Sequence, residues 1–189
     1  NSGSTTKVIT SNGAVASSVQ SNFYGGSYLF NGSSDLLSTP SSSDYNFGTG
    51  DYTAEGWVYI TTTGDEYMMS MGTTVGLHWG LNFYSTNLIR AGRTDGGGTF
   101  KHEVTYNFTA NRWYHLAVSR QSGTSRLFLD GVMIDSKSDT DDIAPNSTLY
   151  FGRYYLTTIY LNGYLQDLRI YKGVAKYTSN FIPASTNPD

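Results

Sequence analysis

The sequence contains no cysteine, so the chain has neither a disulfide nor a thiolate metal site. Without cysteines, the sequence does not indicate whether the protein works in an oxidising or a reducing compartment. No apolar run approaches the roughly 20 residues that a membrane-spanning helix needs. The formal net charge of −3 does not supply the basic surface that nucleic-acid binding requires. We therefore expect neither membrane insertion nor a nucleic-acid partner.

Charged residues are also scarce, at 14% of the chain, whereas aromatic residues reach 15% and include 16 tyrosines. Tyrosine and threonine suit pleated, half-buried strands. Glutamate and lysine, which populate solvated helix faces, are few. This composition is typical of a β-rich protein located outside the cell or on the surface of a virion. At 189 residues the chain fits a single domain of that kind.

Short strand-like segments separated by turns fill most of the chain. Residues 52–60 alternate two sets of side chains, and both sets contain apolar groups, as expected for a sandwich strand with one face in the core and the other partly covered. Residues 113–120 and 125–136 are expected to form antiparallel strands, with a tight turn at Asp130-Gly131. Many short strands with turns every 8–12 residues, about the usual spacing, predict a two-sheet sandwich or jelly roll. One helical turn is expected at residues 172–177.

Four segments of the chain carry a resemblance to a known family. They are residues 25–37 (GGSYLFNGSSDLL), 44–59 (DYNFGTGDYTAEGWVY), 113–134 (with WYHLAVSR and LFLDGVMI) and 163–171 (GYLQDLRIY). In order and spacing they resemble the laminin-G-like family of concanavalin A-like jelly rolls. The ending, residues 172–183, is similar to the endings of such domains in tailed-phage structural proteins.

The resemblance covers nearly the whole chain, from about Val8 to Pro183. It implies an all-β fold of two antiparallel sheets, and non-catalytic recognition, often of glycans, with calcium bound in many members. We expect the folded domain to span residues 7–183, with residues 1–6 as a linker and residues 184–189 as an exit linker.

Two small residues depart from the family's pattern. Ala54 and Gly56 stand where the family usually places bulky apolar side chains. This departure indicates a locally altered core, or a large neighbour that fills the space, such as a tyrosine or Trp57.

Two stretches combine aromatic, amide and basic side chains, the groups that commonly grip sugars. If they are adjacent in the fold, they form a concave aromatic patch with positive charge. We expect Trp79 and Tyr154, each beside a turn-like glycine, to be exposed, and Tyr84 and Tyr160 to pack into the sandwich. His102 is expected to be exposed, whether or not it reaches a ligand. The candidate ligand-binding residues are Trp79, Tyr84, Arg90, Arg93, His102, Arg153, Tyr154 and Tyr155, with Asn82 and Tyr160 beside them.

The one candidate cofactor is a structural calcium ion, which takes six to eight oxygens from carboxylates and loop carbonyls. Asp35 and Asp167 lie in segments that meet if the first and last strands pair, so they are candidate calcium ligands. Asp139, Asp141 and Asp142 form a second acidic cluster. Its spacing lacks the glycine and the terminal glutamate of an EF-hand loop, and we interpret it as a solvated turn.

The sequence offers little for catalysis. A glycosidase needs two carboxylates at a defined separation, and the three glutamates, Glu55, Glu66 and Glu103, form no acidic cluster on an expected strand. His115 shares a strand face with Trp113 and is interpreted as structural. No nucleophile elbow and no histidine spacing for zinc is present. We therefore expect a protein that is not an enzyme, and glycoside hydrolysis is the weakest alternative.

The favoured hypothesis is a recognition and adhesion module that binds cell-surface carbohydrate, or another host-surface receptor, within a larger virion or extracellular appendage protein such as a tail fibre. Weak binding at a shallow aromatic site would be raised by multivalency. The main alternative is a structural or decoration domain that contacts other virion proteins through its tyrosine-rich face. Appendage proteins are often trimers, so by analogy a homo-oligomer is a candidate partner arrangement, and the sequence leaves the oligomeric state open.

Overall fold

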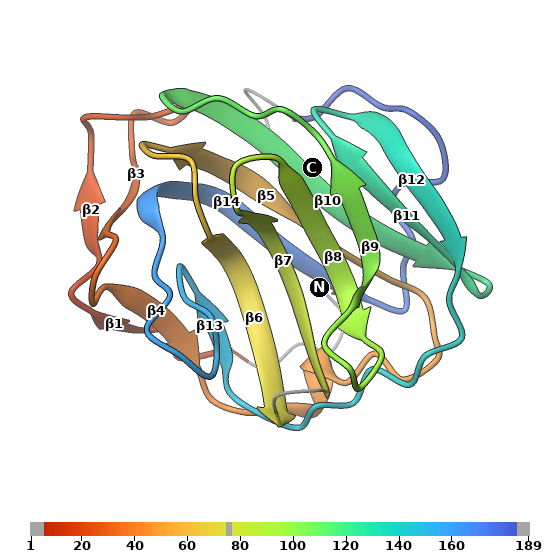
Figure 1. Ribbon diagram of the computed structural model, residues 1–189. Coiled ribbons are helices and arrows are strands. Elements are labelled where there is room, and N and C mark those ends of the chain that lie inside the picture. Colours follow the sequence, from red (N-terminus) through yellow and green to blue (C-terminus); the bar gives the residue numbers. More distant parts are fainter. Residues whose placement is uncertain (1–5, 75–76, 185–189) are drawn as a thin grey trace.

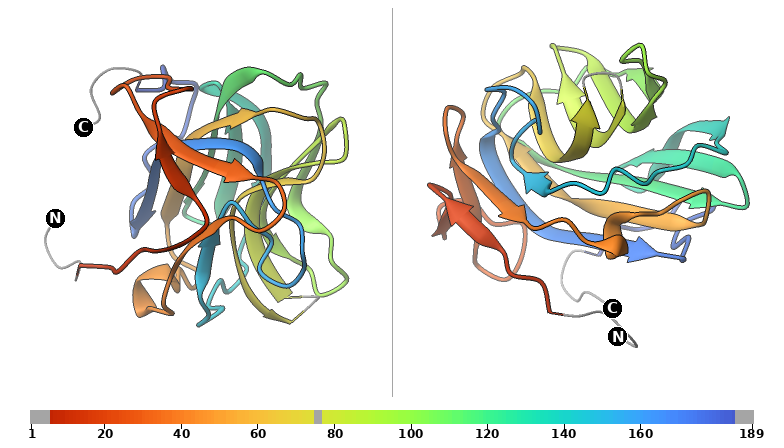
Figure 2. Two further views of the ribbon diagram at one scale, coloured as in Figure 1. Left: turned by 90° about the vertical axis from the view of Figure 1, so that its left-hand side faces the viewer. Right: turned by 90° about the horizontal axis from the view of Figure 1, so that it is seen from below.

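The computed structural model describes residues 6–74 and 77–184, which form two seven-stranded sheets packed face to face (Figure 1). Viewed from below in Figure 2, the two sheets lie as separate layers. The front sheet has the strand order β1 (Thr10–Asn12), β4 (Leu36–Thr39), β13 (Leu149–Phe151), β6 (Glu66–Thr74), β7 (Leu77–Tyr84), β8 (Leu88–Thr94) and β9 (Phe100–Thr105). The back sheet has the order β12 (Val132–Ser138), β11 (Thr124–Leu129), β10 (Arg112–Gln121), β5 (Tyr52–Ile60), β14 (Asn162–Lys172), β3 (Ser27–Asn31) and β2 (Val15–Ser17).

Neighbouring strands in both sheets run antiparallel, so the all-β jelly-roll sandwich expected from the sequence is confirmed. Within the described residues, the helical structure is a single 3-10 turn, η1 (Ser43–Tyr45), and no helix has the length and apolar character needed to cross a membrane. The predicted helical turn at residues 172–177 is wrong. There the chain runs extended along the back sheet, where Thr53 Oγ1 donates a hydrogen bond to Val174 O at 3.0 Å.

The central strand β5 shows why the sandwich forms. Tyr52, Ala54 and Val58 point inward and are fully buried in the core between the sheets. On the opposite face of β5, the C-terminal segment, residues 174–184, lies over Trp57. The indole Nε1 of Trp57 donates a hydrogen bond to Ala184 O of this segment at 3.1 Å. Both faces of β5 are therefore covered, as the two apolar sets of side chains predict. The predicted linkers lie mostly outside the described residues.

The small residue Gly56 is accommodated by a bulge in the neighbouring strand β14. The register between β14 and β5 shifts between Gln166 and Arg169, and Asp167 adopts a positive φ of 53°. The bulge brings Leu168 over Gly56, so that a Cβ placed there would lie 2.3 Å from Leu168 Cδ2. A large neighbour thus fills the space, and it is a leucine, not the tyrosine or tryptophan that we expected.

The sandwich is closed at one edge by a buried histidine. His102 of β9 has no exposed surface, and its Nδ1 and Nε2 each lie 2.9 Å from a partner in the back sheet, Asp135 Oδ2 and Ser125 Oγ. Burial lowers the pKa of His102, which favours the neutral ring. The predicted exposure of His102 is wrong because the residue joins the two sheets, and its burial removes it from any surface site.

One member of the second acidic cluster is buried, whereas Asp141 is half-buried and Asp142 is exposed, as expected of a solvated turn. The buried member, Asp139, is 1% exposed and lies 3.4 Å from the guanidinium of Arg120, which is fully buried in β10. Arg120 also donates hydrogen bonds to the carbonyl oxygens of Gly48 at 2.6 Å, Gly50 at 2.9 Å and Asp141 at 2.8 Å. Asp139 is therefore part of the folded framework.

A buried carboxyl group lies at the start of β6. Glu66 is 3% exposed, and its two carboxylate oxygens accept hydrogen bonds from Asn162 N at 2.7 Å and Thr62 Oγ1 at 3.1 Å. Burial nevertheless raises the pKa of Glu66 to about 7, because the charged form is desolvated. In the unfolded chain this carboxyl titrates near pH 4.5.

We therefore predict that the contribution of Glu66 to stability is lost as the pH rises, opposite in sign to the contribution of His102. The folded state binds the Glu66 proton more tightly than the unfolded state, so the stabilisation is complete below pH 4.5 and is lost as the pH passes 7. The free energy of unfolding should fall by roughly 2–3 kcal/mol across this range. Urea unfolding at several pH values measures the slope, and Glu66→Gln should flatten it. An unchanged slope in Glu66→Gln would assign the effect to another group.

Candidate functional site

The outer face of the front sheet carries the candidate site. Along β7, Trp79, Leu81 and Phe83 are buried in the core, and because successive side chains of a strand alternate, the residues between them point outward. The predicted exposure of Trp79 is therefore wrong. Its side chain is 1% exposed, and its indole Nε1 donates to the Tyr52 hydroxyl oxygen at 3.3 Å. Because it is part of the core, Trp79 cannot contact a ligand on the outer face.

Glycines leave a strip without bulky side chains across the middle of this face. Ser70 of β6, Gly80 of β7 and Gly92 of β8 are partners in register. Phe100 of β9 lies over the strip, with a ring atom 3.3 Å from the point where a Cβ on Gly80 would stand. The absence of a side chain at Gly80 is what allows an aromatic ring to lie directly on the strand.

Aromatic rings from several strands and a loop meet on this strip. The His78 ring centroid lies 4.9 Å from that of Phe100 and 5.2 Å from those of Tyr154 and Tyr155. The centroids of Tyr67 and Tyr154 are 4.8 Å apart. Tyr154 and Tyr155 belong to the loop between β13 and β14, which brings them onto the outer side of β6 and β7. We call the resulting surface the aromatic face: Tyr67, His78, Tyr84, Arg90, Phe100, Glu103, Tyr154 and Tyr155.

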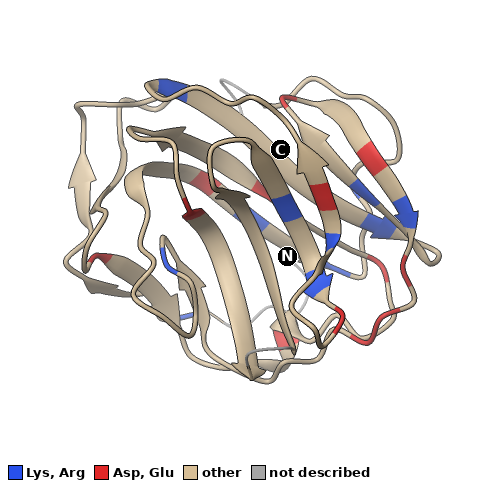
Figure 3. Cartoon of the chain, viewed as in Figure 1, with Lys and Arg blue, Asp and Glu red and all other residues tan. Residues whose placement is uncertain are grey.

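Arg90 of β8 links these rings to a charged edge. Its guanidinium carbon lies 3.4 Å from the Tyr84 ring centroid and 5.7 Å from that of Phe100, a cation–π arrangement. Its Nε lies 3.0 Å from Glu103 Oε1. Figure 3 shows the blue and red segments of β8 and β9 side by side, and β7 without charge. The basic group is thus neutralised, and the positive charge expected for this patch is balanced by Glu103.

Three tyrosine hydroxyls of the aromatic face remain protonated at neutral pH, because burial disfavours their charged form. Burial raises the pKa of Tyr67, Tyr154 and Tyr155 above their ordinary value. A protonated phenol both donates and accepts hydrogen bonds. Tyr155 uses its hydroxyl to bond the carbonyl oxygen of Thr74, which fixes its ring. Tyr154 is only half-buried, and its hydroxyl interacts with that of Tyr155.

The remaining predicted residues lie at the margin of the aromatic face or away from it. Arg153 stacks on Tyr150 and Tyr160, at 5.2 and 5.5 Å from their ring centroids. Arg93 lies at the margin, in a depression that it lines together with His78 and Asp142. Tyr84 and Tyr160, which we expected inside the sandwich, are half-buried and do not belong to the core. Four of the eight candidate ligand-binding residues come together on the aromatic face: Tyr84, Arg90, Tyr154 and Tyr155.

Four residues of the aromatic face, Tyr67, His78, Phe100 and Glu103, were not among the sequence candidates. For His78 the signal was present in the sequence, because it shares the parity of Asn82 and Tyr84 along residues 77–84. The same parity excludes Trp79. For Phe100 no local pattern predicts that its ring reaches across β8 to lie over Gly80 of β7.

The two candidate calcium ligands do not meet. The first and last long strands do pair, with Asn31 opposite Asn162, but Asp167 lies farther along β14 and Asp35 lies beyond Asn31 in the opposite direction. At about 3.3 Å per residue, Asp167 is roughly 16 Å from Asn162. Asp35 accepts the backbone N–H of Asn31 at 3.1 Å, and Asp167 lies 2.9 Å from Arg169 Nε. These carboxylates do not fit a shared calcium site, and in the described part of the chain no three His, Asp or Glu side chains converge as metal ligands.

The three glutamates occupy three separate parts of the molecule. Glu55 lies on the outer side of the back sheet beneath the C-terminal segment, where Tyr177 donates to its carboxylate at 2.8 Å and His115 Nε2 lies 3.3 Å away. Glu66 lies at the start of β6. Glu103 is the carboxylate of the aromatic face and is paired with Arg90. No two of these groups are thereby placed as the pair that glycoside hydrolysis requires.

A two-layer antiparallel jelly roll defines the class, a concanavalin A-like β-sandwich. The chain belongs to the laminin-G-like family of the concanavalin A-like lectin/glucanases superfamily, whose sequence model matches residues 31–176. The resemblance seen in the sequence is therefore confirmed. No curated protein sequence matches the chain.

Solved structures of the same fold include several carbohydrate-active proteins. Domain 4 of AbnA, a GH43 extracellular arabinanase from Geobacillus stearothermophilus, in complex with arabinotriose, matches 90% of this chain and 84% of its own, with 16% identity and a TM-score of 0.66. The binding domain of botulinum neurotoxin serotype D matches with a TM-score of 0.63 and 14% identity, over 88% of this chain and 43% of its own. A Trypanosoma rangeli sialidase mutant with trans-sialidase activity matches with a TM-score of 0.63 and 14% identity, over 88% of this chain and 27% of its own. The chain thus spans less than half of the last two proteins.

The glycine strip yields a prediction for Gly80→Val. A Cβ at Gly80 stands 3.3 Å from Phe100, and the valine methyl groups would push this ring off the strand. The free energy of unfolding should fall by about 1–3 kcal/mol. Thermal unfolding followed by near-UV circular dichroism measures the loss. Gly64→Val, in a loop where a Cβ meets no atom closer than 3.9 Å, is the matched control and should unfold like the native chain.

Proposed function

We propose that the chain is a non-catalytic carbohydrate-recognition module and that its aromatic face binds a neutral oligosaccharide. The observation that carries the proposal is the set of packed rings on one sheet face, centred on His78 and joined by Tyr154 from the loop above it. The rings already fix one another in the free protein, so ligand binding would need little further ordering of side chains.

The chemistry of the aromatic face suits a sugar ring. A pyranose or furanose presents an apolar C–H surface that packs on an aromatic face, and hydroxyls at its edge that need hydrogen bonds. Tyr154 and Tyr84 supply half-buried rings that carry hydroxyl groups. Arg90 and Glu103 supply donors and acceptors at the edge of the same surface. A bound sugar would therefore have both kinds of contact within a single face.

The comparisons support a sugar ligand at the level of the fold. The arabinanase domain with the same architecture was solved with arabinotriose. At 16% identity this likeness supports a role in carbohydrate binding without assigning the sugar. The neutral charge of the Arg90–Glu103 pair is our reason for preferring neutral oligosaccharides to acidic ones.

The proposal excludes catalysis by the aromatic face. Glycoside hydrolysis needs two carboxyl groups flanking the bond that is cleaved. The aromatic face supplies Glu103, which Arg90 holds as an ion pair at 3.0 Å. We extend the proposal to a module of a larger extracellular appendage, in which several weak, shallow sites act together to give useful avidity.

A protein-contact function is the second candidate. It is favoured by the depth of the packing, because Tyr67, His78 and Phe100 are each 4% exposed and present a nearly closed surface. A structural domain would bury this surface against another protein of the same assembly. Sugar binding that depends on Tyr154 distinguishes the two functions.

For the carbohydrate function we predict that Tyr154→Ala weakens oligosaccharide binding by about tenfold, equivalent to roughly 1.4 kcal/mol. A glycan array identifies the neutral sugar, with arabinotriose as one member, and isothermal titration calorimetry gives the affinities. Tyr28→Ala removes an equally large ring on a different part of the molecule and should leave the affinity unchanged. A folded protein that binds no neutral oligosaccharide would favour the protein-contact function.

The neutral character of the aromatic face is tested by Glu103→Gln. This change removes the negative partner of Arg90 and leaves a net positive charge beside Tyr84. We expect binding of acidic oligosaccharides to increase about three- to tenfold at low salt, corresponding to 0.6–1.4 kcal/mol, with little change for neutral ones. Equal effects on acidic and neutral sugars would show that Arg90 does not face the ligand.

A further inference from the structure

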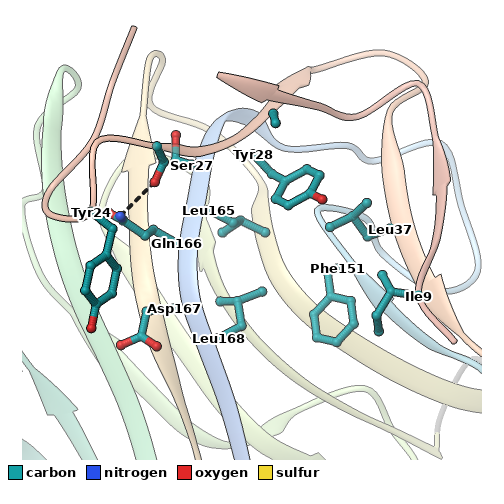
Figure 4. Close-up of a pocket in the computed structure, with 12 residues that line it drawn as sticks. Ile9, Tyr24, Ser27, Tyr28, Leu37, Phe151, Leu165, Gln166, Asp167 and Leu168 are labelled. Carbon is teal, nitrogen blue, oxygen red and sulfur yellow. Dashed lines mark hydrogen bonds between the residues drawn. The ribbon is translucent and has the colours of Figure 1, made fainter. Parts of the chain in front are cut away.

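A cavity of about 540 Å³ opens at the edge of the sandwich where β2 and β3 face β4 and β13 (Figure 4). Leu37, Phe151 and Leu165 are core residues that form its floor, and each is less than 10% exposed. Ile9 and Tyr28 stand at its mouth, 51% and 44% exposed. The cavity is therefore a continuation of the hydrophobic core that reaches the surface.

The strand register explains why this part of the core is unfilled. On the back sheet, Ala16 of β2 lies opposite Tyr28 of β3, which lies opposite Leu165 of β14. On the front sheet, Leu37 of β4 lies opposite Phe151 of β13. The two rows face one another across the sandwich, and the outermost back-sheet position holds alanine. Its single methyl group is too small to close the gap.

The opposite edge of the sandwich is closed in a different way. There, His102 bridges the two sheets with hydrogen bonds of 2.9 Å to Asp135 and Ser125. An equivalent bridge at the β2 edge would have left the apolar floor enclosed. The apolar lining reaches the surface here instead, at Ile9 and Tyr28, so its burial by a ligand is favourable.

The polar groups of the cavity gather at one end. Figure 4 shows Tyr24, Gln166 and Asp167 on one side, and Leu37, Phe151 and Ile9 on the other. The amide of Gln166 is already engaged, because its Nε2 donates to Gly26 O at 2.7 Å and its Oε1 accepts from Asn22 N at 2.9 Å. The Tyr24 hydroxyl lies at this end with the Asp167 carboxylate, whose Oδ1 pairs with Arg169 Nε at 2.9 Å, so that a ligand hydroxyl would donate to the other carboxylate oxygen, Oδ2.

We propose that this cavity is a second binding site, for a small and largely apolar molecule with a hydroxyl group at one end. Its volume lies within the range of roughly 300–1,000 Å³ that is typical of small-molecule sites. The apolar body would pack between Leu165 and Phe151, and the hydroxyl would donate to Asp167. A sugar does not fit this lining, because its many hydroxyls would lose their hydrogen bonds against leucine and phenylalanine.

The site is tested with 6-propionyl-2-(dimethylamino)naphthalene, a neutral fluorophore whose emission shifts to the blue in apolar surroundings. The native chain should bind it saturably at one site, and 2-naphthol should displace it. Ala16→Trp places an indole in the cavity from an exposed strand position, so it should weaken binding at least about tenfold and leave the fold intact. Val15→Trp is the matched control, since its side chain points away from the cavity and binding should be unchanged.

The hydroxyl end is tested by competition. A single hydrogen bond predicts that 2-naphthol displaces the fluorophore about two- to tenfold better than 2-methoxynaphthalene. Equal displacement would overturn the assigned polar end. No saturable binding, or equal losses in Ala16→Trp and Val15→Trp, would overturn the site. A native dimer on gel filtration that Ala16→Trp converts to a monomer would assign the cavity to self-association instead. Oligosaccharide binding should be unaffected by Ala16→Trp, so the proposal for the cavity and the proposal for the aromatic face can be refuted separately.

Discussion

The packing of two inner sheet faces against each other governs everything else that this protein presents. Once Trp79, Leu81 and Phe83 enter the core, strand alternation sends His78 and Tyr84 to the outer face of the same strand. A shift of one residue in register would exchange the two sets and remove both the core and the aromatic face. The recognition surface is therefore not an addition to the fold. It consists of the side chains that alternate with the core residues along each strand and so point to the opposite face.

Glycine determines how close aromatic rings come to the sheet. At Gly80 the missing side chain admits the ring of Phe100, and at Gly56 it admits Leu168 from the bulge of β14. In both places a neighbouring strand supplies the volume that the glycine lacks. The first exchange contributes to a cluster of rings packed edge to face on the outer side of the sheet, and the second completes the core where the family usually has a bulky residue. A glycine that admits a neighbouring side chain thus helps to form the proposed binding surface at Gly80 and stabilises the core at Gly56.

The sequence predicted the all-β sandwich because alternation, turns and family resemblance pointed the same way. It predicted the site less well. Tyr84 and Tyr154 were found from composition, but Trp79 and His102 were misplaced, because a glycine neighbour or a glycine-rich loop was interpreted as a sign of exposure. In the structure Trp79 obeys the parity of its strand, and His102 is buried as a bridge between sheets. Contacts between distant strands, such as Phe100 over Gly80, have no local signature.

The scarcity of charge connects these features. A binding surface built from lysine and glutamate would hold flexible, solvated side chains that must be ordered by the ligand. Here the one ion pair of the aromatic face, Arg90 with Glu103, is anchored on the Tyr84 ring, and the other rings support each other. Each contact on such a surface contributes little binding free energy, but the side chains lose little conformational entropy when a ligand binds. It suits shallow recognition of uncharged ligands, and it explains how a chain so rich in tyrosine can present polar tips while keeping its ring bodies packed.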